Sequence, residues 1–209
     1  QVEVVYNGLQ ELTIYPFDEE VFLKKHEITK SDKILLCISR LHSEKDLETI
    51  VDAINILQRS DIHLFIAGGG LNTDYHKLLL TKLRDFDLES NVHFLGFRND
   101  IKELMKVSNA VIHSSLSESF GFVIVEAMQQ KTPIIATEIP ALVEVATKNA
   151  AFFFPPKNSK KLSHQINHVL SLEGSPLLSK KLDFGLKRYQ ENFTFKIMMK
   201  KYEKLYESI

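Results

Sequence analysis

The sequence predicts an α/β fold in which helices cover both faces of a parallel six-stranded sheet. Short apolar runs alternate along the chain with amphipathic helical patterns. Alternation at this spacing indicates strand–helix–strand units, and such units make neighbouring strands parallel. No repeat, low-complexity tract or interdomain linker interrupts the pattern. We therefore expect a single domain over residues 1–209, entered by an amino-terminal arm at 1–30.

Six apolar runs have the length of buried strands. The first lies between two charged residues, the second ends at three glycines, and the third ends at one glycine. The fourth leads into two serines, the fifth begins at a proline, and the sixth ends at two prolines. The expected strands are 34–38, 63–67, 91–95, 110–113, 133–136 and 150–154.

The helices are indicated by apolar stripes that recur with the period of one helical face. The stripe of the first helix is Leu47, Ile50, Val51, Ile54 and Leu57. After the sixth strand the pattern changes, because three helical segments follow without a strand between them. The expected helices are 47–57, 75–86, 101–107, 121–130, 162–170, 177–189 and 194–208.

The last of these helices has an extensive apolar face. It consists of Phe195, Met198, Met199, Tyr202, Leu205, Tyr206 and Ile209. The face either packs on its own domain or crosses to a domain outside this sequence, and the pattern leaves both interpretations open. The arm raises the same question, since Asn7-Gly8 is a turn dipeptide close to its start.

Composition narrows the class of protein. With 209 residues, a net charge of -1, 44% hydrophobic and 25% charged residues, the chain resembles ordinary soluble domains. No apolar run approaches the roughly 20 residues that span a bilayer. The start lacks the features of a signal peptide and an initiator Met, so we expect an excised piece of a longer cytoplasmic protein. There is no basic stripe with interleaved aromatics, so we expect no nucleic-acid partner.

The most informative segment holds two carboxylates, Glu118 and Glu126, around the start of a helix expected near Phe120. Open α/β sheets bind ligands at this place, just past a buried strand. Eight residues of helix span about 12 Å, roughly the separation of a sugar and a ribose across a diphosphate. The free N–H groups of a helix start suit a phosphate, and Gly121 allows close backbone approach. Alternatively, Ser115 and Glu118 form a capping box, and Glu126 is a solvated helix residue.

Two further segments lie at ends of neighbouring strands. Arg40 and Lys45 follow the first strand and could neutralise a diphosphate, although this segment taken alone favours a solvated charge pair. The glycines at 68–70 end the second strand, but they match neither a dinucleotide fingerprint nor a P-loop. They indicate permissive backbone at a crevice, or a simple tight turn.

Other candidates favour structural interpretations. Cys37, the one cysteine, lies within an apolar strand and is expected to be an inert core thiol, which excludes an internal disulfide and fits a reducing compartment. Asp85 and Asp87 suit a surface helix end better than a metal site. His113 ends the fourth strand, where a structural role is favoured over ligand contact. The eight histidines have no paired metal spacing, so no metal site is predicted.

Taken together, these pieces form an ordered set. It comprises Asn7-Gly8, Ser39-Arg-Leu with Lys45, Ile66 to Gly70, Val92 to Gly96, Ser115 to Met128, and Thr132 to Thr137. The set resembles the carboxy-terminal, donor-binding domain of family 4 (group 1) retaining glycosyltransferases of the GT-B fold. The resemblance covers about residues 5 to 170, and the two glutamates spaced by seven residues are its most specific part.

The resemblance implies a Rossmann-like, nucleotide-sugar-binding domain. By it, Glu126 would bind the ribose hydroxyls and Glu118 the transferred sugar, while Arg40 and Lys45 would carry the charge of the diphosphate. Glu118, Arg40 and Lys45 would be the catalytic residues. The remaining donor-binding positions would be Gly69, Gly70, Phe97, Arg98, Phe120, Gly121, Phe122 and Val123, with Phe97 and Arg98 bordering the base.

The same resemblance implies metal-independent hexosyl transfer, with retention, from a UDP- or GDP-sugar. The acceptor, a sugar or a lipid-linked sugar, would be held by an amino-terminal domain absent here, so the isolated domain is expected to be inactive or nearly so. Surface-polysaccharide or glycolipid biosynthesis is the expected setting, which would allow peripheral association of the full-length enzyme with the inner face of the membrane. A nucleotide-sugar 2-epimerase and a non-catalytic nucleotide-binding module stay open as alternatives.

The sequence departs from the family pattern in three places. Asp46 and Lys131 stand where the family has glycine, and Pro140-Ala141 replaces a glycine pair, although Glu144 keeps its place. None of these departures removes a charge from the expected site. The last one puts in doubt a sugar contact from that loop.

Overall fold

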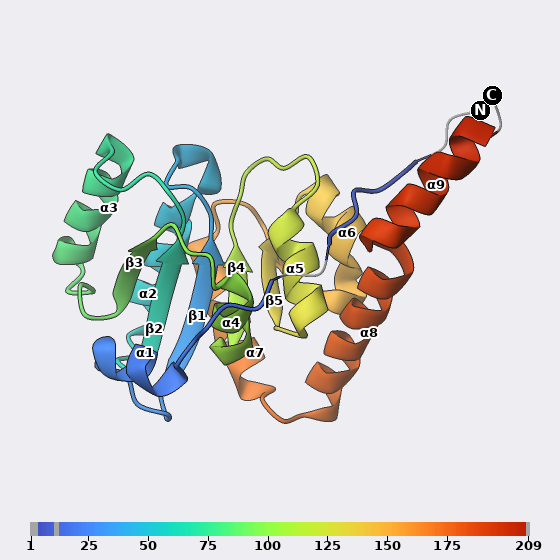
Figure 1. Ribbon diagram of the computed structural model, residues 1–209. Coiled ribbons are helices and arrows are strands. Elements are labelled where there is room, and N and C mark those ends of the chain that lie inside the picture. Colours follow the sequence, from blue (N-terminus) through green and yellow to red (C-terminus); the bar gives the residue numbers. More distant parts are fainter. Residues whose placement is uncertain (1–3, 11–12, 208–209) are drawn as a thin grey trace.

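The structure, a computed structural model, describes residues 4–10 and 13–207. Within these residues one six-stranded sheet has the order β3-β2-β1-β4-β5-β6, and every neighbouring pair is parallel. Helices cover both of its faces (Figure 1), which confirms the predicted fold class. The strands are β1 Lys33–Ile38, β2 Ile62–Ala67, β3 Val92–Gly96, β4 Ala110–His113, β5 Ile134–Thr137 and β6 Phe152–Phe154.

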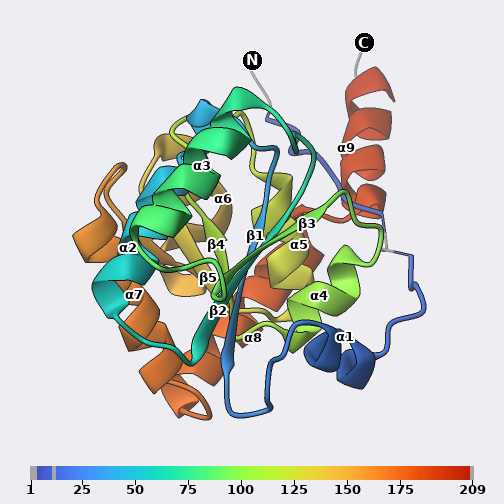
Figure 2. The same cartoon turned by 90° about the vertical axis from the view of Figure 1, so that its left-hand side faces the viewer.

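The helices divide into two layers because side chains alternate between the two faces of each strand. Leu35 and Cys37 face a core formed with α2, α3 and α7, whereas Leu36 faces a core formed with α1, α4, α5 and α6. Figure 2 shows the two layers from the side. The helices are α1 Glu19–Lys25, the 3-10 helix η1 Ser43–Lys45, α2 Leu47–Leu57, α3 Asp74–Asp85, α4 Ile101–Val107, α5 Phe122–Gln130, α6 Pro140–Ala150, α7 Ser159–Ser171, α8 Pro176–Asn192 and α9 Phe195–Glu207.

Three of these elements, α1, η1 and α6, do not appear among the expected ones. The sequence contains a signal for α6, because Leu142, Val145 and Ala146 have helical spacing, and in the structure they are buried. Pro140 suggests a loop, yet it occupies the first turn of the helix, where a proline needs no N–H partner.

The amino-terminal arm is bound to the junction between α8 and α9. Leu9 forms a parallel bridge with Thr194: its N–H donates to Phe193 O at 2.7 Å, and Phe195 N–H donates to Leu9 O at 2.9 Å. Gly8 is required there, since a Cβ would lie 2.6 Å from Thr194 O. This contact gives Asn7-Gly8 a structural reason. Ile209, the last residue of the apolar face, lies outside the described residues.

The strand order fixes where a ligand can bind. The chain crosses from β1 outward to β2 and β3, and then returns to the other side of β1 with β4. The connections on either side of β1 and β4 therefore diverge at the carboxyl ends of these strands, which leaves a crevice between them. The loops after β1 and β4 contain Arg40, Lys45 and Glu118.

Candidate active site

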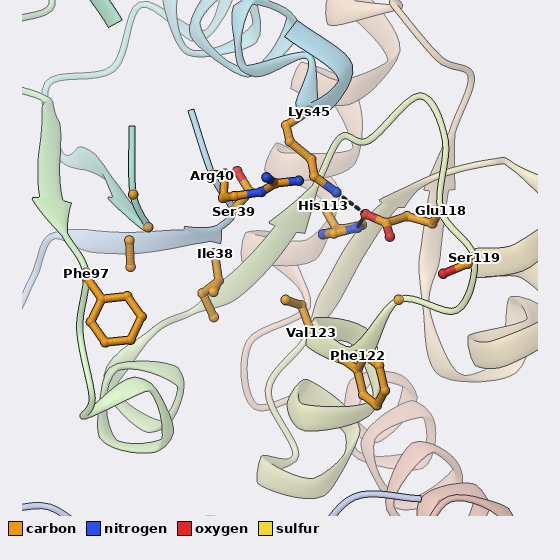
Figure 3. Close-up of a pocket in the computed structure, with 14 residues that line it drawn as sticks. Ile38, Ser39, Arg40, Lys45, Phe97, His113, Glu118, Ser119, Phe122 and Val123 are labelled. Atoms are coloured by element: carbon orange, nitrogen blue, oxygen red, sulfur yellow. Dashed lines mark hydrogen bonds and ion pairs between the residues drawn. The ribbon is translucent and has the colours of Figure 1, made fainter. Parts of the chain in front are cut away.

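A cavity of about 360 Å³ occupies this crevice. Its walls come from the ends of β1, β2 and β4 and from the segment that leads into α5 (Figure 3). The predicted site residues that line it are Arg40, Lys45, Gly69, Phe97, Glu118, Gly121, Phe122 and Val123. Sequence reasoning did not select Ile38, Ser39, Ala67, Gly68, His113 and Ser119, which also line it.

Four predicted site residues do not line this cavity. Phe120 is buried in the core, where its ring packs edge-to-face on Phe122. A Cβ on Gly70 would lie 3.0 Å from Leu41 O, and Arg98 lines a neighbouring cavity that shares Phe97 with the first one. Glu126 is partly buried in α5, and burial raises its pKa above the ordinary value.

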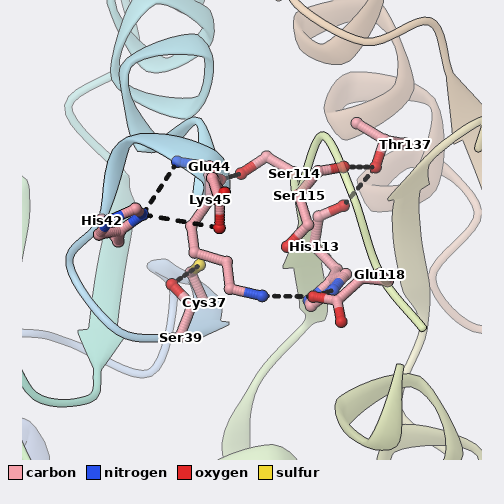
Figure 4. A network of polar contacts seen from close by, with 10 residues as sticks. All are labelled: Cys37, Ser39, His42, Glu44, Lys45, His113, Ser114, Ser115, Glu118 and Thr137. Carbon is pink, nitrogen blue, oxygen red and sulfur yellow. Dashed lines mark hydrogen bonds and ion pairs between the residues drawn. The ribbon is translucent and has the colours of Figure 1, made fainter. Parts of the chain in front are cut away.

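Glu118 is held by side chains from two other elements, β4 and η1. Its Oε1 atom lies 2.5 Å from Lys45 Nζ and 3.0 Å from His113 Nε2 (Figure 4). The hydrogen bond with His113, and then that with Lys45, lowers the pKa of Glu118 to about 2. The carboxyl group is therefore ionised at neutral pH, although only 16% of the side chain is exposed.

The position of Lys45 is fixed by its backbone. Ser114 Oγ donates to Lys45 O at 2.5 Å, and Leu116 N–H donates to Glu44 O at 2.9 Å. These bonds tie η1 to the loop after β4. The long-range pair of Lys45 and Glu118 therefore lies between two loops that are already joined through their main chains.

Arg40 differs from Lys45. Within residues 4–10 and 13–207 its guanidinium has no hydrogen bond and no ion pair, and the residue is exposed at the mouth of the cavity. An unpaired cation at the carboxyl end of a parallel strand can bind a phosphate. Arg40 is therefore available to an anionic ligand without losing an existing partner.

The start of α5 also presents free donors. Gly121 is the N-cap residue and has no side chain to bond the first N–H groups, so the amides of Phe122 and Val123 have no partner within the helix, whereas Ile124 N–H donates to Gly121 O at 3.0 Å. Gly121 has a φ of 89°, and a Cβ there would lie 2.5 Å from Leu142 Cδ2. Glycine is thus required by both conformation and space.

This geometry corrects two expectations. The helix begins at Phe122 and its cap is Gly121, so a capping box of Ser115 and Glu118 does not form. Glu118 precedes the helix, and the helical rise therefore does not give its separation from Glu126. The two carboxylates come from a loop and a helix and not from one helical face.

The glycines after β2 have different roles. A Cβ on Gly68 would lie 1.9 Å from Ser39 O, so the chain after β1 passes too close for any other residue. A Cβ on Gly69 would meet nothing within 4 Å. Gly69 therefore exposes its backbone to the cavity, as expected for close approach of a ligand, while Gly68 brings two strand ends together.

The remaining candidates lie outside the site. Cys37 is buried, and burial raises the pKa of its thiol to about 12, as expected for an inert core residue. Asp85 ends α3, and Asp87 follows it in a left-handed turn. Over the described ranges no group of three or more histidine, cysteine, aspartate or glutamate residues could hold a metal ion. In the same ranges no helix is long and apolar enough to cross a membrane.

Comparison with known proteins decides the family. Residues 18–184 match the model of the family described as glycosyl transferases group 1. The chain belongs to this family. A relative, the uncharacterized glycosyltransferase MJ1607 of Methanocaldococcus jannaschii, is 30% identical over 97% of this chain and 50% of its own length. The lipopolysaccharide glucosyltransferase WaaG of Escherichia coli K12 is 27% identical over 78% of this chain and 43% of its own.

Solved structures agree with this assignment. Anabaena HepE, in complex with UDP and glucose, superposes with a TM-score of 0.87 at 25% identity, over 99% of this chain and 57% of that one. The fold is that of the carboxy-terminal domain of a GT-B glycosyltransferase. The group 1 chain described here spans about half the length of such relatives, with 50% for MJ1607 and 57% for HepE.

Proposed function

We propose that this domain binds the donor of a group 1 glycosyltransferase, a nucleoside diphosphate sugar. The observation that carries the proposal is the crevice in which Arg40, the Lys45–Glu118 pair and the uncapped start of α5 face one cavity. Cations and free amides suit a diphosphate, and an ionised carboxylate suits sugar hydroxyl groups. The complex of HepE with UDP and glucose supports this ligand class.

In the proposed arrangement the diphosphate lies between Arg40, Lys45 and the first amides of α5. Glu118 accepts hydrogen bonds from the transferred sugar, and Glu126 accepts them from the ribose. Phe97, which is 81% exposed at the far end of the cavity, borders the base together with Arg98. Glu126 does not line the empty cavity, so this role requires the ribose to lie beyond it along α5.

We propose that the complete enzyme transfers a hexosyl group with retention. The bond from the anomeric carbon to the diphosphate breaks, and the acceptor oxygen bonds to that carbon on the same face. The acceptor proton passes to the departing diphosphate, whose charge Arg40 and Lys45 stabilise. In this scheme the positive charge comes from side chains and not from a metal ion.

The setting is inferred from relatives. WaaG is a lipopolysaccharide glucosyltransferase and RfbU of Salmonella typhimurium an O-antigen chain mannosyltransferase. We propose a role in surface polysaccharide or glycolipid assembly, in the cytoplasm at the inner face of the membrane. The acceptor, a sugar or a lipid-linked sugar, would be held by an amino-terminal domain, so the chain alone should bind nucleotide weakly and transfer little or no sugar.

Calorimetric titration of this chain with UDP, GDP and ADP tests donor binding. We expect one of the three to bind. Glu126→Ala should weaken binding of that nucleotide, whereas Glu118→Ala should leave it almost unchanged and weaken the preference for its sugar conjugate. Glu44→Ala is the matched control, since its carboxylate is 71% exposed beside Lys45. Failure of all three nucleotides to bind, or equal losses in the two variants, contradicts the proposal.

One observation favours a second candidate, an isomerase similar to nucleotide-sugar 2-epimerases. Such an enzyme needs a histidine in the cleft, and His113 lines this one. It also needs further catalytic acids, whereas among the described lining residues Glu118 is the single acid. Release of free nucleoside diphosphate in the presence of an acceptor, measured on a chain that includes the amino-terminal domain, separates transfer from epimerisation.

A further inference from the structure

Among the described residues that line the cavity, His113 is the one buried titratable group that the proposed function does not use. It is the last residue of β4, and its side chain is 4% exposed. Its backbone carbonyl accepts a bond from Thr137 Oγ1 at 3.5 Å, and the same hydroxyl donates to Ser115 O at 2.7 Å. The end of β4 is thus fixed to β5, and the imidazole has a defined position below Glu118.

The two carboxylate oxygens of Glu118 differ in their hydrogen bonds. Oε1 accepts hydrogen bonds from both His113 Nε2 and Lys45 Nζ. Neither of these two bonds is to Oε2, and a side-chain hydrogen bond from Ser115 also lowers the pKa of the carboxyl group. Oε1 is therefore anchored by both His113 and Lys45, whereas Oε2 has neither anchor, and Glu118 lines the cavity, where a ligand hydroxyl could donate to Oε2.

The two anchors cannot keep the same role once a diphosphate binds. Lys45 is the cation that the proposed function assigns to the diphosphate, together with Arg40. An ammonium group shared with a diphosphate holds Oε1 less firmly, because its three donors then divide between two anions. His113 is less accessible to a diphosphate than Lys45, since its side chain at the end of β4 is 4% exposed and that of Lys45 is 19% exposed.

We propose that His113 is the positioning residue that holds Glu118 Oε1 when Lys45 engages the diphosphate, so that Oε2 remains directed at the sugar. This inference rests on the proposed function and adds a residue to it. It requires a proton on Nε2, which the hydrogen bond to a carboxylate already demands. Glu118 is the charged group that contacts the imidazole, and Lys45 on η1 and Arg40 after β1 line the same cavity.

The test separates sugar binding from nucleotide binding. Affinities for UDP and UDP-glucose, and for GDP and GDP-mannose, are measured on the whole chain and its variants. In His113→Phe, which keeps the volume and removes the donor, the affinity for the sugar conjugate should fall about tenfold while that for the nucleotide is unchanged. In His113→Gln, whose amide can donate from a similar place, most of the loss should be recovered.

Two variants serve as comparisons. Lys45→Met should lower the affinity for the nucleotide and for its sugar conjugate to the same extent, because Lys45 binds the diphosphate that both ligands contain. His76→Phe should change neither affinity, since His76 is a buried histidine of α3 that packs on Phe94 outside the cavity. If His113 only supports the fold, His113→Phe should instead have a lower melting temperature and a lower affinity for both the nucleotide and its sugar conjugate.

A spectroscopic measurement does not depend on any variant. The Nε2–H proton of His113 should stay hydrogen-bonded and protected from exchange in the NMR spectrum after UDP-glucose or GDP-mannose is added. Loss of that proton on binding, or an unchanged sugar preference in His113→Phe, overturns the inference while nucleotide binding still stands. If the wild-type chain binds none of the four probes, the proposed function and this inference fail together.

Discussion

Glu118 shows how a single residue depends on contacts that are distant in sequence. Its partner Lys45 is 73 positions away, whereas His113 is five positions away. Both bond to the ionised form, and the bond from His113 is the main reason that the pKa falls from 4.5 to about 2. The folded state therefore binds a proton at this carboxyl less readily than the unfolded chain does.

This difference predicts an acid dependence of stability. A carboxyl whose pKa is lowered on folding contributes stability that is present above pH 4.5 and is lost as the pH falls toward 2. Glu118→Gln should therefore be less stable than the wild type at pH 7, and the difference in unfolding free energy should shrink through this range. Urea denaturation at several pH values measures it. Glu89→Gln, at an exposed position, is the control, and a difference that does not vary with pH contradicts the prediction.

At the residue scale, the charged residues that line the cavity could be predicted from the sequence. The polar and aromatic lining residues were harder to predict. Arg40, Lys45 and Glu118 follow strand ends of the predicted sheet, where open α/β sheets bind their ligands. His113 carries no such signal, because a histidine at a strand end is usually structural. Its role depends on the loop that turns Glu118 back over it, and that turn follows from the contact between the loop and η1.

At the scale of elements, the backbone conformation explains why glycine is favoured at two of the positions where this chain departs from the family pattern. Asp46 lies between η1 and α2 with φ 50° and ψ 45°, and Lys131 follows α5 with φ 55° and ψ 36°. Both conformations are left-handed, where glycine has no steric cost and other residues do. Glycine is thus favoured at these two positions by the connections of the fold and not by the ligand.

Lys131→Gly should therefore stabilise the domain. Relief of the left-handed strain is worth about 1 kcal/mol, and the larger entropy of glycine in the unfolded chain offsets part of it. The ion pair of Lys131 Nζ with Asp183 Oδ1, at 2.6 Å, is lost, but both side chains are exposed and the pair contributes little. We expect a net gain of about 0.5 kcal/mol in unfolding free energy by urea denaturation.

Lys131→Ala is the matched control for this change. It removes the same ion pair but keeps a Cβ in the left-handed conformation. Its unfolding free energy should therefore stay below that of Lys131→Gly. Equal stabilities of the two variants would show that the conformation at this position carries no strain.

The elements themselves were predictable to different degrees. The strands are buried on both faces, so each appears as an apolar run, and the observed boundaries differ from the expected ones by at most two residues. In contrast, α1 is a seven-residue helix with two buried side chains, Phe22 and Leu23. So short a helix is stabilised by tertiary packing and not by its own pattern, and the sequence gives little sign of it.

At the scale of the whole molecule, the order of the strands could not be obtained from periodicity alone. The alternation of strands and helices is compatible with several orders of a parallel sheet. The order β3-β2-β1-β4-β5-β6 depends on pairings between strands distant in sequence, and it was not predicted. The pairing of the arm with the α8–α9 junction is likewise a long-range contact, between residues 9 and 194, that no local pattern encodes.

The last helix, α9, is poorly covered by its own domain over its described length. In both views α9 projects away from the body (Figures 1 and 2), and over its described length none of its residues is buried. Its apolar side chains include Tyr202, which is 39% exposed, and Tyr206, which is 72% exposed. We propose that this face packs on an amino-terminal domain, as the sequence pattern allowed.

Substitution of both tyrosines tests the proposal. In this chain Tyr202→Gln with Tyr206→Gln should change the unfolding free energy by less than about 1 kcal/mol, as exposed positions do. Tyr189→Gln, at a position 6% exposed in α8, should cost about 3 kcal/mol and serves as the buried control. In a chain that includes the amino-terminal domain, the double variant should lower the melting temperature by several degrees, because its apolar contacts would then be lost. If the double variant destabilises the present chain as much as Tyr189→Gln does, α9 packs on its own domain and the proposal is wrong.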